Sequence, residues 1–317
     1  NKFSNPVLSS MTTLTKSVLP YKTIELTLDT ESIDEVDFNE IEVALDVHEE
    51  YLISKQVCKF GVFIPMNIFE KIKTYLPKPT EYGGALIIRS YNLDKVNGQY
   101  IPVAKLGYPL ATETPGKFET VSPPISTFNF HTHPYHCYRK YGCAVGWPSD
   151  ADISSIPYMR HSSAGNIAHF VVSVEGVYSI QLTPEFSQYL DKLYTGDFMN
   201  YSDCHKTFLD KITKMFNYLN SLRTRDEPEY IRKYIEYMNS VSIKYILEDD
   251  EITESNKVCT WIGTLTDFKM YVVTYQSWDK IENADGFYFE VNALRWKGEC
   301  PPSITDGLDL IGDKPLL

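Results

Sequence analysis

Two histidines and an acid carry the strongest chemical signal in the sequence. His131 and His133 are separated by one residue, and Asp152 follows a short distance along the chain. Alternate residues of a strand point to the same face, so the two imidazoles would lie side by side at a strand end. Two histidines and one carboxylate, with a fourth position left to water, are typical ligands of a catalytic zinc. The sequence therefore predicts that these three residues bind Zn²⁺.

Two further residues fit the same chemistry. Ser149 occupies an expected helix N-cap, three residues before Asp152 in the first turn, so one turn would supply a ligand and a hydroxyl donor. Glu81 opens a buried strand just before two glycines. Each pattern alone has a plainer interpretation: a polar strand end, an ordinary capping box, or a solvated loop acid. Their combination favours a metal site.

The whole chain has an ordinary globular composition. Its 317 residues are 43% apolar and 23% charged, and the formal net charge is −12. Such a charge argues against general binding of nucleic acid or anionic membranes. No apolar run is long enough for a membrane span, and the N-terminus lacks the apolar core of a signal peptide. Six cysteines are too sparse for a disulfide scaffold, which predicts a reducing, cytoplasmic compartment.

Hydrophobic periodicity divides the chain into five parts and predicts an α/β (α+β) fold. The predicted parts are a flexible N-terminal arm (1–20), an N-terminal β layer (21–60), a catalytic core (61–185), a helical and β region (186–300) and a tail (301–317).

The elements that must position the candidate residues are short. The expected ones are a helix over 66–76, a strand over 81–88, a turn at Asn97-Gly98, a strand over 125–131, a helix over 150–159 and a hairpin formed by 168–174 and 177–182. Downstream we expect amphipathic helices between 184 and 241, and strands over 259–265, 269–275 and 286–293.

Three separated motifs resemble the JAMM (MPN+, JAB1-type) zinc metalloproteases. They are Glu81-x-x-Gly84-x-Leu86, His131-Thr132-His133-Pro134 and Ser149-x-x-Asp152, and the resemblance covers roughly residues 60–185. It implies a central mixed sheet flanked by helices. The spacing departs from the family, because the insert from 135 to 148, with His136, Cys137 and Cys143, is longer than usual. The insert is either a longer loop over the cleft or an accessory zinc site. The same segment is similar to JAMM-like proteins of large cytoplasmic DNA viruses.

The resemblance also implies a mechanism. His131, His133 and Asp152 would hold Zn²⁺, Glu81 would act as general base towards a metal-activated water, and Ser149 would donate to the oxyanion. The family hydrolyses peptide or isopeptide bonds, often beside ubiquitin or a ubiquitin-like protein. A protein substrate, such as a ubiquitin conjugate, is therefore the expected partner.

Two other classes stay open. One is a scaffold protein that keeps the MPN fold with an unused metal site, for example a minor component of a virion or of a multi-subunit complex. The other is a His-x-His metal hydrolase of the amidohydrolase or PHP type. That class needs a barrel of alternating strands and helices, and the sequence shows no such alternation.

Overall fold

The computed structural model describes residues 57–107, 114–115, 126–161, 166–196, 210–217, 219–223, 228–243 and 267–294. The chain divides into two units, Asn1–Gln56 and Val57–Leu317, and every described residue belongs to the second. The expected N-terminal arm, almost all of the N-terminal β layer, the strand over 259–265 and the tail lie outside the described residues.

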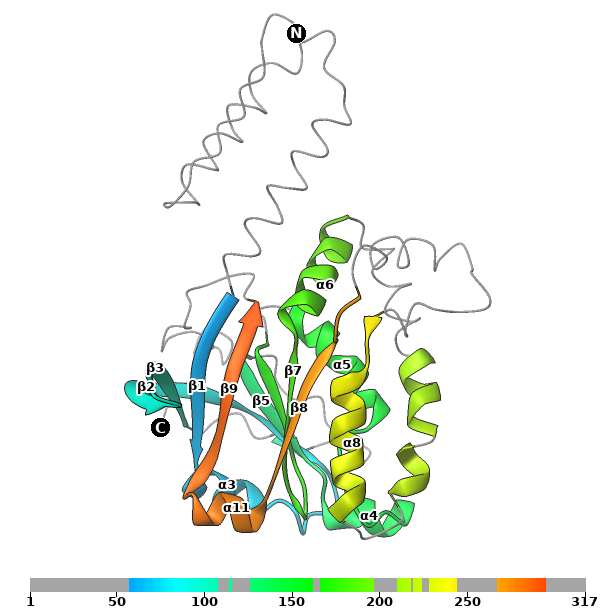
Figure 1. The fold of residues 1–317 in the computed structure, drawn as a ribbon. Helices are drawn as coiled ribbons and strands as arrows, with labels where there is room; N and C mark the ends of the chain where they lie inside the picture. The colour runs from blue at the N-terminus through cyan, green and yellow to red at the C-terminus, as the bar shows by residue number, and fades with distance from the viewer. Residues whose placement is uncertain are drawn as a thin grey trace, which may run out of the picture. The chain divides into compact units, whose positions relative to one another are not determined.

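A nine-stranded sheet runs through the described part of the chain, in the order β8-β7-β6-β5-β2-β3-β1-β9, with β4 beside β2 (Figure 1). The strands are β1 (Val57–Pro65), β2 (Tyr82–Val96), β3 (Gln99–Gly107), β4 (Thr114–Pro115), β5 (Phe128–Thr132), β6 (Ala168–Val172), β7 (Gly176–Leu182), β8 (Tyr271–Ser277) and β9 (Gly286–Leu294). With its helices this sheet makes a mixed α+β fold, as the sequence predicted.

The sheet is mixed because two of its pairings are parallel. β5 pairs with β6 in parallel, as does β1 with β3, and the other pairings are antiparallel. A parallel pair needs a crossover, and α4 (Tyr135–Tyr141) and α5 (Asp150–His161) lie in the connection from β5 to β6. The C-terminal strands β8 and β9 join opposite ends of the sheet, so this region extends the sheet that carries the core.

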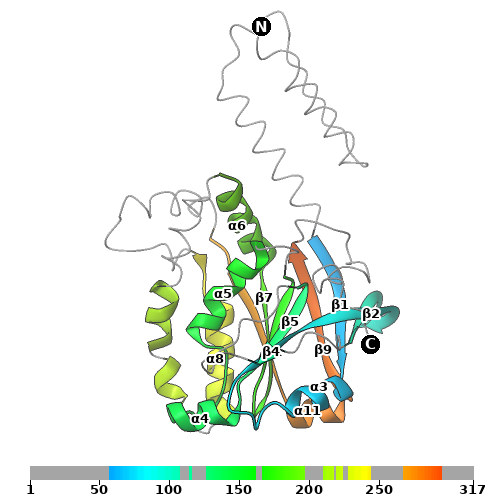
Figure 2. The same cartoon turned by 180° about the vertical axis from the view of Figure 1, so that it is seen from behind.

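The predicted turn at Asn97-Gly98 joins β2 to β3. Both residues have positive φ, 49° and 83°, as a two-residue hairpin turn with right-handed twist requires. The strand predicted over 81–88 continues to Val96, so the hairpin is longer than expected. Figures 1 and 2 show it projecting from the side of the sheet.

Two hydrophobic cores cover the sheet. One packs α5, α6 (Pro184–Gly196), α8 (Pro228–Ser240) and the helical segments 210–217 and 219–222 against β7 and β8. Figure 2 shows α5, α6 and α8 on one side of these strands. The other packs α3 (Met66–Lys73) and α11 (Trp278–Asn283) against β1, β2, β5 and β9. The sequence predicted α3, α5, α6 and α8, and it missed α11 and α4.

β6 and β7 contribute side chains to both cores. On β7, Tyr178 and Ile180 belong to one core and Val177 to the other. Every residue of both strands is buried, which is typical of strands covered on both faces. A polar side chain on these strands therefore has to find its partner inside the protein.

Two findings bear on the environment of the chain. No helix within the described residues is long and apolar enough to cross a membrane. Cys58 in β1 is disulfide-bonded.

Candidate metal centre

The end of β5 presents the two histidines as predicted. Phe128 and Phe130 enter the core shared with α3, whereas Asn129 and His131 point to the opposite face. The next alternate residue, His133, lies just beyond the strand, where its amide still donates to the Val172 carbonyl of β6 at 2.9 Å. Both imidazoles are buried, and their Nε2 atoms lie 3.1 Å apart.

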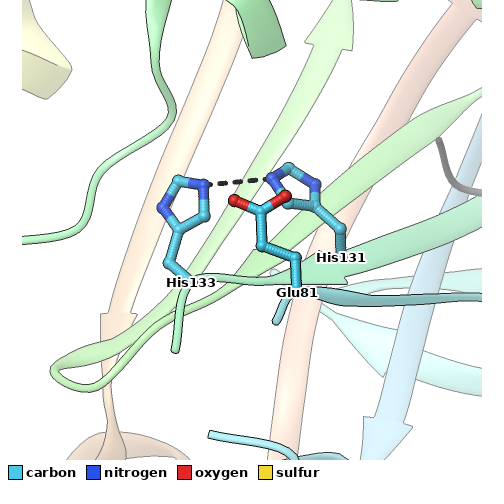
Figure 3. Close-up of side chains that lie close together, drawn as sticks. All are labelled: Glu81, His131 and His133. Atoms are coloured by element: carbon cyan, nitrogen blue, oxygen red, sulfur yellow. Dashed lines mark hydrogen bonds between the residues drawn. The ribbon is translucent and has the colours of Figure 1, made fainter. Parts of the chain in front are cut away.

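Glu81 reaches the histidines from the start of β2. The Tyr82 amide donates to Thr132 Oγ1 at 2.9 Å, and Gly83 pairs with His131, so the first residues of β2 lie beside the end of β5. Figure 3 shows the Glu81 carboxylate in front of the gap between the two rings. One ligand atom from each of Glu81, His131 and His133 lies within 4.8 Å of the other two, so this group could hold a metal ion.

Gly84 permits the close approach of β2 and β5. A Cβ atom at this position would lie 2.6 Å from Cε1 of Phe130, a distance that any larger residue would have to relieve by moving the ring. The glycine of the Glu-x-x-Gly motif is therefore needed for the packing of β2 against β5. This packing places Glu81 beside the histidines.

Asp152 completes the group from the first turn of α5. Ser149 and Asp152 form a reciprocal capping box: the Ser149 amide donates to Asp152 Oδ2 at 2.7 Å, and the Asp152 amide donates to Ser149 Oγ at 3.2 Å. The same carboxylate faces both histidines, with Oδ1 3.3 Å from His131 Nε2 and Oδ2 3.3 Å from His133 Nε2.

The spacing of the two histidine nitrogens fits a tetrahedral zinc. Zinc bonds of about 2.0–2.1 Å separate neighbouring ligand atoms by about 3.3 Å. The two Nε2 atoms lie 3.1 Å apart, close to one edge of such a tetrahedron, and each faces a different oxygen of the Asp152 carboxylate at 3.3 Å. Two acids, Asp152 and Glu81, therefore face the histidines, and either could supply the third ligand.

Charge at the site is arranged for a cation. Burial opposes the charged form of His131, but the carboxylates of Asp152 and Glu81 outweigh it and raise the pKa of the imidazole. Burial likewise opposes the charged form of Asp152, yet the two histidines hold the pKa of that carboxyl well below its ordinary value. The carboxylate thus stays ionised beside the two imidazoles.

A set of hydrogen bonds centred on Glu175, called here the Glu175 brace, holds the insert near the site. His133 Nδ1 donates to the Gly146 carbonyl at 2.9 Å, and the Gly146 amide donates to Glu175 Oε1 at 2.7 Å. The Tyr178 hydroxyl donates to the same Glu175 oxygen at 2.7 Å, and Tyr138 from α4 donates to the other. Sequence reasoning missed this brace, because Glu175 lies in a hairpin turn whose only local signal was its glycine.

The insert itself is partly helical, since it contains α4. Among the described residues, the geometry needed for a metal ion is found around His131 and His133 and does not include the insert. His136 is exposed, and neither Cys137 nor Cys143 is part of a disulfide. The accessory zinc site weighed for the insert therefore has no support in these residues.

The chain is similar to proteins of large DNA viruses. It is 25% identical to "Uncharacterized protein 3R" of Frog virus 3 over 62% of its own length and 43% of that protein. It is 29% identical to "Uncharacterized protein 229L" of Invertebrate iridescent virus 3 over 41% of its own length and 23% of that protein. The chain thus spans less than half of each relative. This weak homology supports a viral origin. No family model and no solved structure matches the chain.

Proposed function

We propose that this chain is a zinc-dependent hydrolase of peptide or isopeptide bonds, of the JAMM type. The observation that carries the proposal is the convergence of His131, His133 and Asp152, in which the two Nε2 atoms lie 3.1 Å apart and each lies 3.3 Å from a carboxylate oxygen. The residues that resemble the family's ligands in sequence are the ones that meet here. When bound, Zn²⁺ supplies a Lewis acid that polarises the substrate carbonyl and lowers the pKa of water to about 7.

Glu81 is the general base in this proposal. Its carboxylate lies beside the two histidines, with an oxygen within 4.8 Å of their ligand nitrogens. A carboxylate in that place can take the proton of an attacking water and return it to the leaving amine. Its position at the start of β2 is fixed by the Tyr82–Thr132 hydrogen bond.

Ser149 stabilises the oxyanion. Its Oγ accepts the Asp152 amide at 3.2 Å, which leaves the hydroxyl proton to be donated elsewhere. A hydroxyl that is held by a helix start beside the metal ligand can donate to a developing oxyanion without costly rearrangement. The substrate class that the resemblance offers is a conjugate of ubiquitin or a ubiquitin-like protein.

Metal analysis of purified variants tests the proposal. We expect about one zinc per chain in the wild type and in Glu81→Gln, and loss of zinc in His131→Ala and Asp152→Ala. Zinc kept by Asp152→Ala and lost by Glu81→Gln would exchange the roles of the two acids. Absence of zinc from the wild type after growth with added zinc would overturn the proposal in favour of a scaffold role.

Cleavage assays follow on the loaded protein. We expect hydrolysis of an isopeptide-linked ubiquitin dimer by the wild type and a loss of at least about 100-fold in Glu81→Gln, since a general base contributes about 10²–10⁴-fold. Equal rates in the two proteins would show that Glu81 does not act as the base.

A further inference from the structure

His131 carries a second contact that the proposed chemistry does not use. Its Nδ1 atom lies 2.7 Å from Nε2 of His169, a residue of β6 that is 1% exposed. The two rings are stacked at 4.9 Å. On the far side, His169 Nδ1 lies 2.7 Å from Oδ1 of Asn129. A histidine buried this deeply between two polar partners has to have a fixed tautomer.

The hydrogen-bond directions follow from Asn166. Its Nδ2 atom lies 2.9 Å from the Ser126 carbonyl and 3.3 Å from the Ala168 carbonyl, so it has to be the amide's donor end. The same Nδ2 lies 3.0 Å from Asn129 Oδ1, which must therefore be an acceptor. The opposite orientation of Asn129 would set two donors against each other. Asn129 Nδ2 instead faces the sulfur of Met159 at 3.5 Å, a weak acceptor.

The remaining bonds then have one consistent direction. Asn129 Oδ1 can only accept, so His169 Nδ1 carries a proton and donates. His169 is 1% exposed, and a second ring proton would place a charge in the interior at high cost, so its ring is neutral and its Nε2 accepts. His131 Nδ1 must then donate to His169. In the neutral ring, Nε2 of His131 is then the unprotonated nitrogen, and it is directed at His133 and Asp152.

We infer that Asn166, Asn129 and His169 form a relay that sets the tautomer of His131 and presents its Nε2 lone pair to a divalent metal ion. The inference rests on the proposed function only for the identity of that ion. The tautomer of His133 is set by a different group, because its Nδ1 donates to the Gly146 carbonyl. Two unprotonated nitrogens that face each other at 3.1 Å repel one another, and a cation between them removes that repulsion.

His169 is a positioning residue in this scheme. Metal-bound histidines ordinarily donate their second nitrogen to a carboxylate, a carbonyl or water. Here the acceptor is another imidazole, whose own direction is set by two asparagine amides on β5 and in the segment before β6. All four polar side chains are buried, so an incorrect tautomer at any step would leave an unpaired donor or acceptor.

The first test is the tautomer itself. Long-range ¹H–¹⁵N spectra of histidine-labelled, metal-free protein distinguish protonated from unprotonated ring nitrogens, at a pH where the imidazoles are neutral. We expect His131 and His169 both in the Nδ1–H form. An Nε2–H form of either ring would overturn the relay. Because no metal is present, this outcome is independent of whether the protein proves to be a zinc enzyme.

The second test measures zinc affinity by competition with a chromogenic chelator. His169→Leu removes the acceptor at similar volume and should weaken binding about 10- to 100-fold. His169→Gln keeps an oxygen within reach of His131 Nδ1 and should restore most of that loss. Equal weakening in both variants would show that the acceptor does not matter. Should His169→Leu fail to fold, the wild-type tautomers and His169→Gln still decide the matter.

Ser179→Ala is the matched control. Ser179 is a fully buried polar residue on the neighbouring strand β7, and it shares a hydrogen bond with Thr274 outside the relay. Its loss should lower stability and leave zinc affinity unchanged. If Ser179→Ala weakened zinc binding as much as His169→Leu, the effect would be general destabilisation and the relay would be refuted.

Discussion

His131 and His133 are two residues apart, yet the structure supports them by different means. His131 is held from inside the sheet, where Asn129 and His169 face each other across the parallel pair β5–β6. His133 is held by the Gly146 carbonyl of a loop. That loop continues through Trp147 to the capping turn at Ser149. We call His131 with its supports in the sheet the sheet half of the site, and His133 with the loop from Gly146 to Ser149 the loop half.

The connection is fixed by a part of the chain distant in sequence. The Ala144 amide donates to the Arg223 carbonyl at 2.6 Å, and the Tyr234 hydroxyl of α8 donates to the Pro148 carbonyl at 3.0 Å. The Trp147 ring stacks on Tyr234 with centroids 4.8 Å apart. Residues after 185 therefore contact the loop half of the site, even though none of those described supplies a candidate ligand.

Breaking the loop half should have the largest effect. Trp147 is fully buried, and Trp147→Ala should cost about 3–5 kcal/mol of unfolding free energy, because it leaves a large cavity beside α8. Urea titrations with and without zinc measure how much the metal raises the unfolding free energy. This zinc increment should be smaller in the variant than in the wild type. Trp147→Phe keeps a stacked ring and serves as control. An unchanged zinc-dependent increment in Trp147→Ala would mean that the loop does not position the ligands.

Perturbing the sheet half gives the contrasting case. Gly84→Ala places a Cβ 2.6 Å from the Phe130 ring and should cost about 1–3 kcal/mol through overpacking. None of the three proposed ligands lies on β2, so the stabilisation conferred by zinc should persist. The same paired titrations measure both quantities. Loss of the zinc increment would make Glu81, on the β2 side, a ligand.

The brace at Glu175 lies between the two halves. Glu175→Gln replaces an acceptor of three donors by an amide that must direct its own donor at one of them, and this should cost about 1.5 kcal/mol. Because Gly146 also accepts from His133, zinc affinity should fall about tenfold in chelator competition. Tyr178→Phe removes one donor without moving Gly146 and should leave the affinity nearly unchanged. Equal zinc affinity in Glu175→Gln and the wild type would show that the Glu175 brace does not position the metal site.

The comparison also explains how far the sequence could lead. The ligand candidates were found because each pair is local: His-x-His at a strand end and Ser-x-x-Asp at a helix start. Their supports were not found, because Asn129 alternates with phenylalanines and looks like a solvent-facing residue. It is fully buried, since α5 covers that face of β5. Tertiary cover of this kind leaves no trace in local spacing.

The role of the C-terminal region was missed for the same physical reason. Its amphipathic stripes predicted helices that pack on a core, and Ile212, Met215 and Phe216 do so. Periodicity cannot reveal that Tyr234, on one such stripe, also directs its hydroxyl at the carbonyl before Ser149. Strands β8 and β9 were predicted with nearly correct bounds, yet their places at opposite ends of the sheet depend on pairing across the whole chain.

The smallest expected effect isolates a single contact between α8 and the loop. Tyr234→Phe keeps the ring stacked on Trp147 and removes only the hydroxyl that donates to Pro148, which should cost about 1 kcal/mol. The capping box would remain, held by the mutual bonds of Ser149 and Asp152, so zinc affinity should fall by less than in Glu175→Gln. Urea unfolding and chelator competition measure the two changes. A fall in affinity larger than that of Glu175→Gln would instead make α8, rather than the Glu175 brace, the main support of the loop half of the site.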